Sequence, residues 1–167
     1  MREVKDPFRT AEASRLLPAD TSIRVLHIGG AMSARDKTRA EREQRSNPRY
    51  TWIGEKPRWQ AIRLMARSRL LVLTSESEGG ANVVSEAIAC RVPVLSTHIS
   101  GSVGLLGSDY PGYFTFGDTQ ALADLLYRAE KDPTFYRALK SGTEARQAIV
   151  RPSSEKASLK TLLADLT

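Results

Sequence analysis

Two glutamates, Glu78 and Glu86, bracket the stretch of this sequence that is best suited to chemistry. Gly79 and Gly80 follow the first glutamate and let the backbone approach a ligand closely. A helix that begins after these glycines presents unpaired amide N–H groups, which bind anions. At ~1.5 Å per residue the two acids stand about 12 Å apart along a helix axis. Such a pair, on either side of an anion site, suits two hydroxyl-bearing rings joined by a diphosphate.

The elements around this stretch are a strand, a helix and a second strand. Residues 70–73 and 92–95 are short, continuous apolar runs, as expected for strands that are covered on both faces. Short connections between strand, helix and strand predict a βαβ unit with parallel strands. The helix between them has an apolar face, made by Val83, Val84, Ala87 and Ile88.

A later helix is expected to begin after Gly117. Asp118 or Thr119 would cap it, because both side chains can accept a hydrogen bond from a free N–H of the first turn.

The segment from Glu78 to Ala87, with Cys90-Arg91-Val92-Pro93-Val94 after it, resembles the Glu-x7-Glu motif of the family-four retaining glycosyltransferases. These enzymes have the GT-B fold, which contains two Rossmann-like domains. The resemblance implies that Glu78 is the catalytic residue that contacts the donor sugar, and that Glu86 binds the ribose hydroxyls. It also implies that the diphosphate faces the amides of Gly79, Gly80, Ala81 and Asn82.

Both glutamates also have simpler interpretations. Ser75-x-x-Glu78 fits a capping box, in which the carboxylate of Glu78 only satisfies backbone donors. Glu86 fits an ordinary solvated position on a helix. The sequence leaves these interpretations open beside the donor site.

Two earlier segments complete the predicted site. Residues 23–30 predict a strand that ends in Gly29 and Gly30, and the resemblance implies that this turn faces the diphosphate. The turn lacks a full G-x-G-x-x-G pattern, so a dinucleotide site is not indicated. Arg35 and Lys37 follow this turn and are the candidates for neutralising the phosphates.

A second strand is predicted at 50–54. Gly54, Glu55 and Lys56, at its end and in the loop after it, are candidate neighbours of the base, with a plain turn as the alternative.

Two histidines lie near the carboxyl ends of predicted strands, where open α/β sheets bind ligands. His27 belongs to the first strand and His98 follows the strand at 92–96. A single histidine at such a place is more often a hydrogen-bonded structural residue than a ligand contact.

Net charge and composition limit the classes of molecule that this chain is expected to bind. The chain has 167 residues, a formal net charge of +6 and a pI near 9.7, which is compatible with nucleic acid, an anionic membrane surface or phosphorylated small molecules. In the predicted helix at 35–45, acids alternate with arginines, pairing Arg39 with Glu43 at i, i+4 spacing. Because no aromatic series accompanies these charges, no nucleic-acid partner is expected.

Metals, disulfides and membranes are not indicated. One cysteine excludes an internal disulfide, and it cannot form a conventional zinc site with two histidines. No acidic metal cluster is present, so no metal and no cofactor are expected beside the nucleotide-sugar substrate. No run is long enough to span a bilayer, and the charged N-terminus differs from a signal peptide. These features favour the cytoplasm.

The fold expected from the whole pattern is α/β, a Rossmann-like parallel sheet flanked by helices, equivalent to the second domain of a GT-B enzyme. Residues 1–20 are assigned to an N-terminal connection or surface segment, with a short helix at 11–17. Residues 21–167 are assigned to a Rossmann-like nucleotide-sugar-binding domain, which ends in a helix at 154–166. A GT-B enzyme needs a second domain for the acceptor. We therefore expect a fragment, a truncated product or one subunit, which binds nucleotide weakly and shows no turnover alone.

The function implied is transfer of a sugar from a nucleoside-diphosphate sugar, with a UDP-sugar as the expected donor. A narrower resemblance is to the selenosugar-synthase branch, which implies selenophosphate as the acceptor. It rests on His27-Ile28-Gly29-Gly30-Ala31, the Glu78 motif with Asn82, and the segment 104–114. Three alternatives remain: a non-catalytic nucleotide-binding or protein-interaction module of flavodoxin-like shape, a nucleic-acid-binding domain using residues 35–69, and a nucleotide-sugar epimerase.

Overall fold

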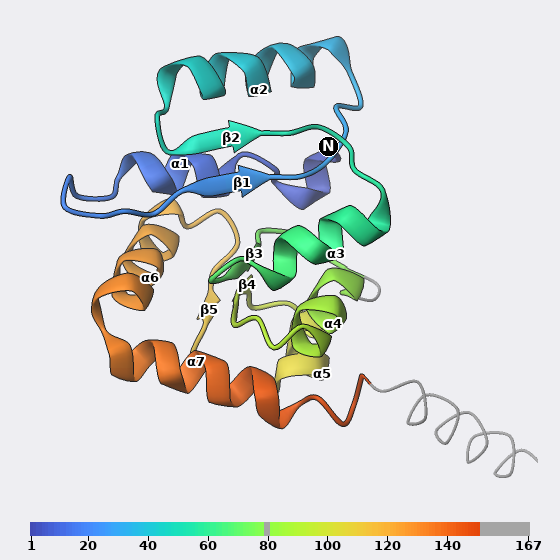
Figure 1. Cartoon of the computed structure of the whole chain (residues 1–167), viewed down its shortest axis with the longest axis vertical. Helices are drawn as coiled ribbons and strands as arrows, with labels where there is room; N and C mark the ends of the chain where they lie inside the picture. The colour runs from blue at the N-terminus through green and yellow to red at the C-terminus, as the bar shows by residue number, and fades with distance from the viewer. Residues whose placement is uncertain (79–80, 151–167) are drawn as a thin grey trace, which may run out of the picture.

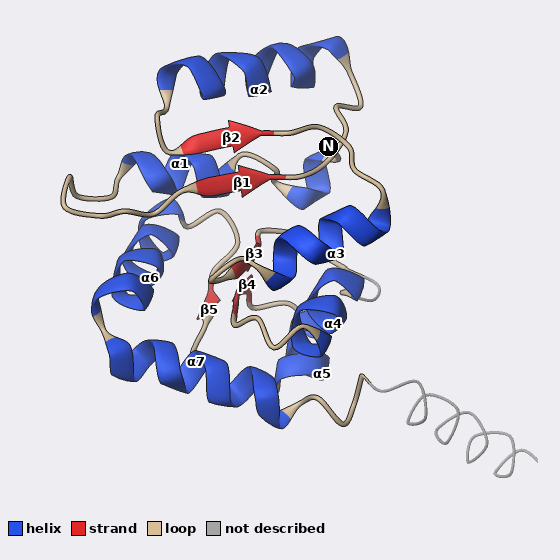
Figure 2. Cartoon of the chain, in the orientation of Figure 1, coloured by secondary structure: helices blue, strands red, loops and turns tan. Residues whose placement is uncertain are grey.

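The computed structural model describes residues 1–78 and 81–150, in which short parallel strands alternate with helices (Figures 1 and 2). In chain order the elements are η1 (Glu3–Lys5), α1 (Arg9–Arg15), β1 (Val25–His27), α2 (Ala34–Ser46), β2 (Tyr50–Trp52), α3 (Arg58–Ala66), β3 (Leu71–Leu73), α4 (Asn82–Ala89), β4 (Val94–Thr97), α5 (Ser100–Leu106), β5 (Tyr113–Phe114), α6 (Thr119–Lys131) and α7 (Pro133–Ala145). The predicted helix at 154–166 lies outside the described residues.

All strand pairings in the described part of the chain are parallel, and they form two sheets. β1 pairs with β2, and β3, β4 and β5 form a second sheet in that order. β4 is central in its sheet and buried along its whole length. The α/β class with parallel strands and flanking helices is therefore confirmed, although the strands divide between two sheets where a single sheet was expected.

The first six residues bridge the two sheets at their carboxyl ends. The backbone N–H of Glu76 donates to the carbonyl of Val4 at 2.9 Å. The Thr74 hydroxyl lies 2.9 Å from the carbonyls of both Lys5 and Asp6. The terminal ammonium of Met1 donates to the carbonyl of Gly30, so the N-terminal segment contacts the chain just after β1 as well as just after β3.

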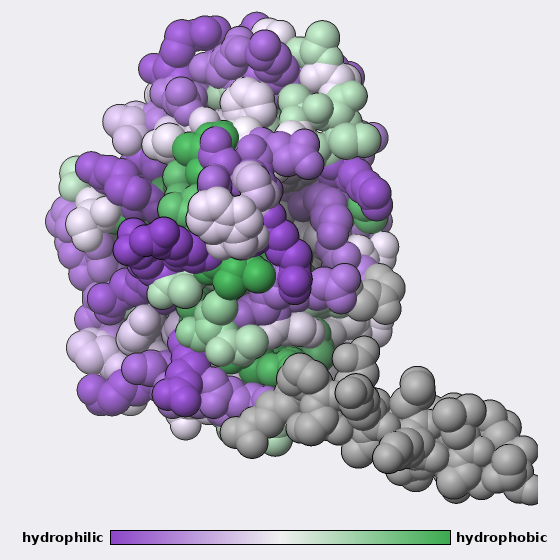
Figure 3. Space-filling model, turned by 45° about the vertical axis from the view of Figure 1, so that its right-hand side comes forward, coloured by the Kyte–Doolittle hydropathy of each residue, from purple (hydrophilic) through white to green (hydrophobic). Residues whose placement is uncertain are grey.

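A cavity of about 630 Å³ separates β1 from β3. Its walls include both strands, with Val25 and Leu26 on one side and Leu71 and Val72 on the other. Leu26 remains 43% exposed as a result. In Figure 3, hydrophobic surface appears in the middle of one face, between hydrophilic side chains.

The helices around β3 and β4 bury the faces that the sequence pattern predicts. In α4, Val84, Ala87 and Ile88 are fully buried, as their helical spacing indicates. Asp118 caps α6 by accepting a hydrogen bond from the N–H of Ala121 at 2.8 Å. The apolar face of α4 is therefore confirmed, and of the two candidate caps for α6 the structure uses Asp118.

Residues 1–20 pack against the rest of the chain through α1. This helix contacts α6 and β1, and Phe8, Ala11 and Ala13 are buried. In Figure 1, α1 lies beside the β1–β2 sheet, and its Arg15 reaches Glu43 of α2. The boundary at residue 20 between a connection and the sugar-binding domain stays a prediction.

Two strands are shorter than the sequence predicts. The run at 23–30 gives a strand only over Val25–His27, and the run at 50–54 only over Tyr50–Trp52. Gly54 has a φ of 70°, a left-handed conformation that ends the second strand.

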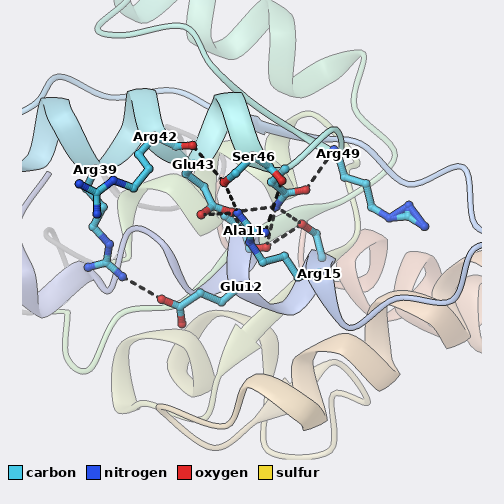
Figure 4. A network of polar contacts seen from close by, with 10 residues as sticks. Ala11, Glu12, Arg15, Arg39, Arg42, Glu43, Ser46 and Arg49 are labelled. Carbon is cyan, nitrogen blue, oxygen red and sulfur yellow. Dashed lines mark hydrogen bonds and ion pairs between the residues drawn. The ribbon is translucent and has the colours of Figure 1, made fainter.

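A polar network joins α1 to α2 (Figure 4). Arg15 binds both carboxylate oxygens of Glu43, at 2.9 and 3.0 Å. Arg39 pairs with Glu12 at 2.8 Å, so the expected pairing of Arg39 with Glu43 inside α2 is wrong. Burial acts to raise the pKa of Glu43. Hydrogen bonds from Arg15 and Asn47 outweigh this effect, so the pKa lies below its ordinary value.

Asn47, the residue after α2, is the buried part of this network. Its side-chain amide donates to the carbonyl of Ala11 at 3.1 Å and lies 3.0 Å from the Ser14 hydroxyl. We expect Asn47→Ala to lower the free energy of unfolding by about 2–3 kcal/mol, because it leaves buried polar groups without partners.

Arg45→Ala is the matched control, since Arg45 lies exposed on the same helix. It should change the free energy of unfolding by less than about 0.5 kcal/mol in urea titrations. Equal effects of the two substitutions would contradict the structural role of Asn47.

Candidate functional site

A second cavity, of about 360 Å³, lies at the carboxyl end of β1. Gly29, Gly30 and Glu55 line it together with Lys5. The N–H of Gly29 donates to the carbonyl of Gly54 at 2.9 Å, and this bond joins the turns after β1 and β2. A Cβ on residue 30 would stand 3.2 Å from a carboxylate oxygen of Glu55. The structure thus brings together the predicted glycine turn and two of the three predicted base neighbours.

Glu78 is bound by two side chains. Its Oε1 accepts hydrogen bonds from the Ser75 hydroxyl at 2.6 Å and from the Lys5 ammonium at 2.5 Å. Its side chain is 11% exposed. Among residues 1–78 and 81–150 these partners are side chains, so the structure shows there an ion pair and a hydroxyl contact in place of the capping box that Ser75-x-x-Glu78 also allowed.

The ionised form of Glu78 is favoured. Burial acts to raise the pKa of Glu78, but the hydrogen bonds from Lys5 and Ser75 and the charges of Lys5 and Arg2 outweigh it. The pKa therefore lies below its ordinary value, and Glu78 is a carboxylate, able to accept hydrogen bonds from hydroxyl groups.

Glu86 lies on α4 and lines the cavity between β1 and β3. Arg58 donates to its Oε1 from Nε at 2.9 Å and from Nη2 at 2.8 Å. The Arg58 side chain is 79% exposed, so this pair is open to water and weak. Glu86 therefore has an ion-pair partner and borders a cavity. An ordinary solvated position on a helix would need neither feature.

Between the two acids, α4 begins at Asn82 after the buried Ala81. No side chain caps this helix at Ala81. Asn82 is exposed on the first turn. Gly79 and Gly80, which were predicted to face the diphosphate, lie outside the described residues.

Gly101, near the start of α5, fixes the position of Glu78 and was not predicted. A Cβ at this position would stand 2.9 Å from the carbonyl oxygen of Glu78 and 3.7 Å from the N of Ala81. Only a glycine lets α5 approach the Glu78 loop so closely. No local pattern signals this role, because the contact spans two elements.

The three predicted basic and loop candidates Arg35, Lys37 and Lys56 line neither cavity. Arg35 and Lys37 lie exposed on α2, and within the described ranges they form no ion pair. The basic residues at the glycine turn are instead Arg2 and Lys5, which line the smaller cavity. They were missed because Lys5 lies 73 positions from Glu78 in the sequence.

His27 is a neutral residue at the end of β1 and lines both cavities. Its Nδ1 lies 2.6 Å from the Tyr50 hydroxyl, and its ring packs edge-on to Phe8. Burial, with the nearby terminal amino charge, lowers the pKa of His27 to about 4. His98 is exposed and packs edge-on to Tyr113, outside both cavities.

The sequence model of the family described as glycosyl transferases group 1 matches residues 1–146. The match covers most of the chain and both glutamates of the Glu78–Glu86 motif. The chain therefore belongs to this family.

Curated relatives include the N-acetyl-alpha-D-glucosaminyl L-malate synthase of Bacillus anthracis, 34% identical over 87 residues, or 52% of this chain and 22% of that protein. The putative teichuronic acid biosynthesis glycosyltransferase TuaC of Bacillus subtilis (strain 168) is 37% identical over 79 residues, or 47% of this chain and 20% of that protein. The matched segments span about a fifth of the length of each relative.

Solved structures with the same fold include Anabaena Alr3699/HepE in complex with UDP-glucose, at a TM-score of 0.79 and 21% identity. That comparison covers 98% of this chain and 46% of the Anabaena chain. The sucrose-phosphate synthase of Thermosynechococcus elongatus aligns at a TM-score of 0.82 and 22% identity, over 99% of this chain and 43% of that one. The fold is that of GT-B glycosyltransferases, and the chain spans less than half of each neighbour.

Neither a membrane span nor a metal cluster occurs in the described residues. In residues 1–78 and 81–150 no helix has the length and apolar character needed to cross a bilayer. The same residues contain no cluster of three or more His, Cys, Asp or Glu side chains suited to a metal ion. The absence of a metal from the reaction stays a prediction.

Gly101→Ala should destabilise the protein, because the added methyl group displaces the Glu78 loop. We expect a loss of about 1–3 kcal/mol in the free energy of unfolding. Gly104→Ala in the same helix is the control, since a Cβ there meets nothing within 4 Å. That substitution should be neutral or stabilise by up to about 1 kcal/mol. Urea titrations measure the free energy of unfolding of each variant. If both variants are less stable than wild type, or both more stable, the proposed packing at Gly101 is wrong.

Stability should fall as the pH is lowered from 7 to 5, because of His27. Its pKa is 6.5 in the unfolded chain and about 4 when folded, so the unfolded state binds more protons between these values. Over that range the free energy of unfolding should fall by about 1–2 kcal/mol. Urea titrations at the two pH values measure this change. His27→Gln should remove most of the slope and His98→Gln should retain it; a slope unchanged by His27→Gln would refute the assignment.

Proposed function

We propose that this chain is the donor-binding domain of a glycosyltransferase that uses a nucleoside-diphosphate sugar, with a UDP-sugar as the donor. The observation that carries the proposal is the meeting of three segments at the carboxyl ends of β1, β2 and β3. The glycine turn and Glu55 share one cavity, and Lys5 joins that cavity to Glu78. Ligands of open α/β sheets bind at this edge. Family membership and the UDP-glucose complex of the Anabaena neighbour support it.

The chemistry of transfer assigns a role to each group. The departing nucleoside diphosphate gains negative charge, which the amides at the start of α4 stabilise. Glu78, held as a carboxylate, accepts hydrogen bonds from the donor sugar and orients it while positive charge develops on the ring. Glu86 accepts hydrogen bonds from the ribose, and Arg58 moves aside from its exposed contact with this carboxylate.

The acceptor belongs to a second domain. Because the chain spans less than half of its structural neighbours, we assign acceptor binding to a further Rossmann-like domain of the same enzyme, and place the enzyme in the cytoplasm. The chain alone then binds nucleotide weakly, without turnover. Selenophosphate as the acceptor is the narrower proposal, and it rests on the resemblance of segments 27–31 and 104–114 to selenosugar synthases.

A non-catalytic nucleotide-binding module is the competing function. It would bind UDP and other nucleotides alike, and it would show no preference for a nucleotide that carries a sugar. A donor domain uses Glu78 for the sugar, so it binds UDP-sugar and UDP differently. Calorimetry with both ligands separates the two functions.

Glu86→Gln tests the ribose assignment. We expect wild type to bind UDP more tightly than 2′-deoxy-UDP, because the missing hydroxyl deprives the carboxylate of a partner. In Glu86→Gln, UDP should bind about tenfold more weakly, a loss of about 1.4 kcal/mol, and the preference for UDP over the deoxy analogue should shrink. Isothermal titration calorimetry measures all four affinities.

Glu144→Gln is the matched control, since Glu144 lies exposed on α7 away from both cavities. It should leave both affinities at the wild-type values. An undiminished preference for UDP in Glu86→Gln would count against the ribose role. Failure of the wild-type chain to bind UDP at all would overturn the donor-domain proposal.

A further inference from the structure

We propose that Lys5 is the cation that binds the donor diphosphate, and that it leaves Glu78 to do so. This inference rests on the proposed donor-binding function. It assigns the phosphate charge to a residue of the N-terminal segment, in place of Arg35 and Lys37. It also explains why Glu78 is paired with a lysine before the sugar arrives.

The position of Lys5 supports this role. Within the described ranges it is the only lysine or arginine that lines both cavities. One of these cavities contains the Gly29–Gly30 turn, and the other contains Glu86. Lys5 therefore borders the cavity at the glycine turn, which is proposed to face the diphosphate, while its ammonium binds Glu78 at 2.5 Å.

The backbone of Lys5 is fixed while its side chain can reorient. Its carbonyl accepts a hydrogen bond from the Thr74 hydroxyl at 2.9 Å. The neighbouring carbonyl of Val4 accepts one from the N–H of Glu76 at 2.9 Å. The Lys5 side chain is 42% exposed, whereas that of Glu78 is 11% exposed. A long, flexible stem on a fixed backbone lets the ammonium exchange partners at little cost in packing.

The other basic residues near the cavities are less suitable. Arg24 and Arg69 line the larger cavity, but they precede β1 and β3 and so lie at the amino ends of the strands. Arg58 is bound to Glu86. His27 is neutral, because burial lowers its pKa to about 4. Arg2 lines only the smaller cavity, so it adds positive charge at the glycine turn but does not border the cavity that contains Glu86.

The exchange is favourable on charge grounds. A diphosphate presents more negative charge and more acceptor oxygens than one carboxylate, so the ammonium gains by moving to it. The move leaves the Ser75 hydroxyl as the donor to Oε1 of Glu78, and the carboxylate can then accept further hydrogen bonds. The hydroxyls of the donor sugar supply them. Binding of the diphosphate thus prepares Glu78 for the sugar.

The experiment compares UDP with uridine by calorimetry, since the two ligands differ only in the diphosphate. Wild type should bind UDP more tightly than uridine. Lys5→Met should weaken UDP binding about tenfold and leave uridine binding unchanged, because it removes one charge-assisted contact. Lys140→Met is the matched control: Lys140 is exposed on α7, outside both cavities, and its variant should bind both ligands as wild type does.

Glu78→Gln is a second, independent test. It releases Lys5 from its carboxylate partner, so UDP, which carries no sugar, should bind more tightly than in wild type. Removal of the Glu78 charge by itself also favours a diphosphate, so the gain is compared with the same change in Lys5→Met: it should be smaller there if Lys5 binds the phosphates, and equal in both backgrounds if Lys5 serves only to hold Glu78. Circular dichroism verifies that each variant is folded, and Lys5→Arg, which keeps the charge, should restore most of the UDP affinity.

The outcomes separate this inference from the function it rests on. If folded Lys5→Met binds UDP and uridine with the same affinity ratio as wild type, the proposed role of Lys5 is wrong. The proposed donor site is not affected by that result. If Lys37→Met loses the preference for UDP over uridine and Lys5→Met keeps it, the cation that binds the diphosphate is Lys37 on α2. No binding of UDP by wild type would overturn both the inference and the donor site.

Discussion

The arrangement of this chain depends on how the N-terminal segment holds the two sheets together. Hydrogen bonds from residues 74 and 76 reach the carbonyls of residues 4–6, and the Lys5–Glu78 ion pair lies beside them. At the other end of this segment, the terminal ammonium of Met1 donates to the carbonyl of Gly30 after β1, so the segment links the end of β1 to the chain after β3. The glycine turn follows β1 of one sheet and Glu78 follows β3 of the other, so the N-terminal segment connects the two parts of the site.

Division of the strands into two sheets creates the spaces at the site. β1 and β3 would be neighbours in one continuous sheet, but a cavity lies between them, and its walls include Leu26 and Val72. Figure 3 shows hydrophobic surface among hydrophilic side chains in the middle of one face of the molecule. The geometry combines apolar walls with a few polar groups at the strand ends, which is typical of small-molecule sites.

Each proposed acid is held by a cation of a different kind. Glu78 is partly buried and paired with Lys5 on a fixed backbone, whereas Glu86 is paired with a more exposed arginine, so water competes for that pair. In the proposed donor complex, hydroxyl groups of the ligand replace both cations. The difference in burial means that the Lys5 pair carries more of the electrostatic energy of the site.

Local sequence was enough to define most elements and the motif, whereas the meeting of charges depended on how the elements pack. The apolar runs at 70–73 and 92–95 and the helical spacing of α4 reflect neighbouring residues only, so they were predictable. The Glu-x7-Glu spacing likewise lies within one turn and one helix, so the residues themselves indicate the family.

By contrast, Arg35 and Lys37 are near the glycine turn in sequence, yet α2 carries them away on its exposed face. Lys5 is far from Glu78 in sequence, yet η1 brings its ammonium to the carboxylate. Periodicity and capping are set by contacts a few residues apart, but the partner of a charge and the room beside a glycine such as Gly101 are set by atoms of another element.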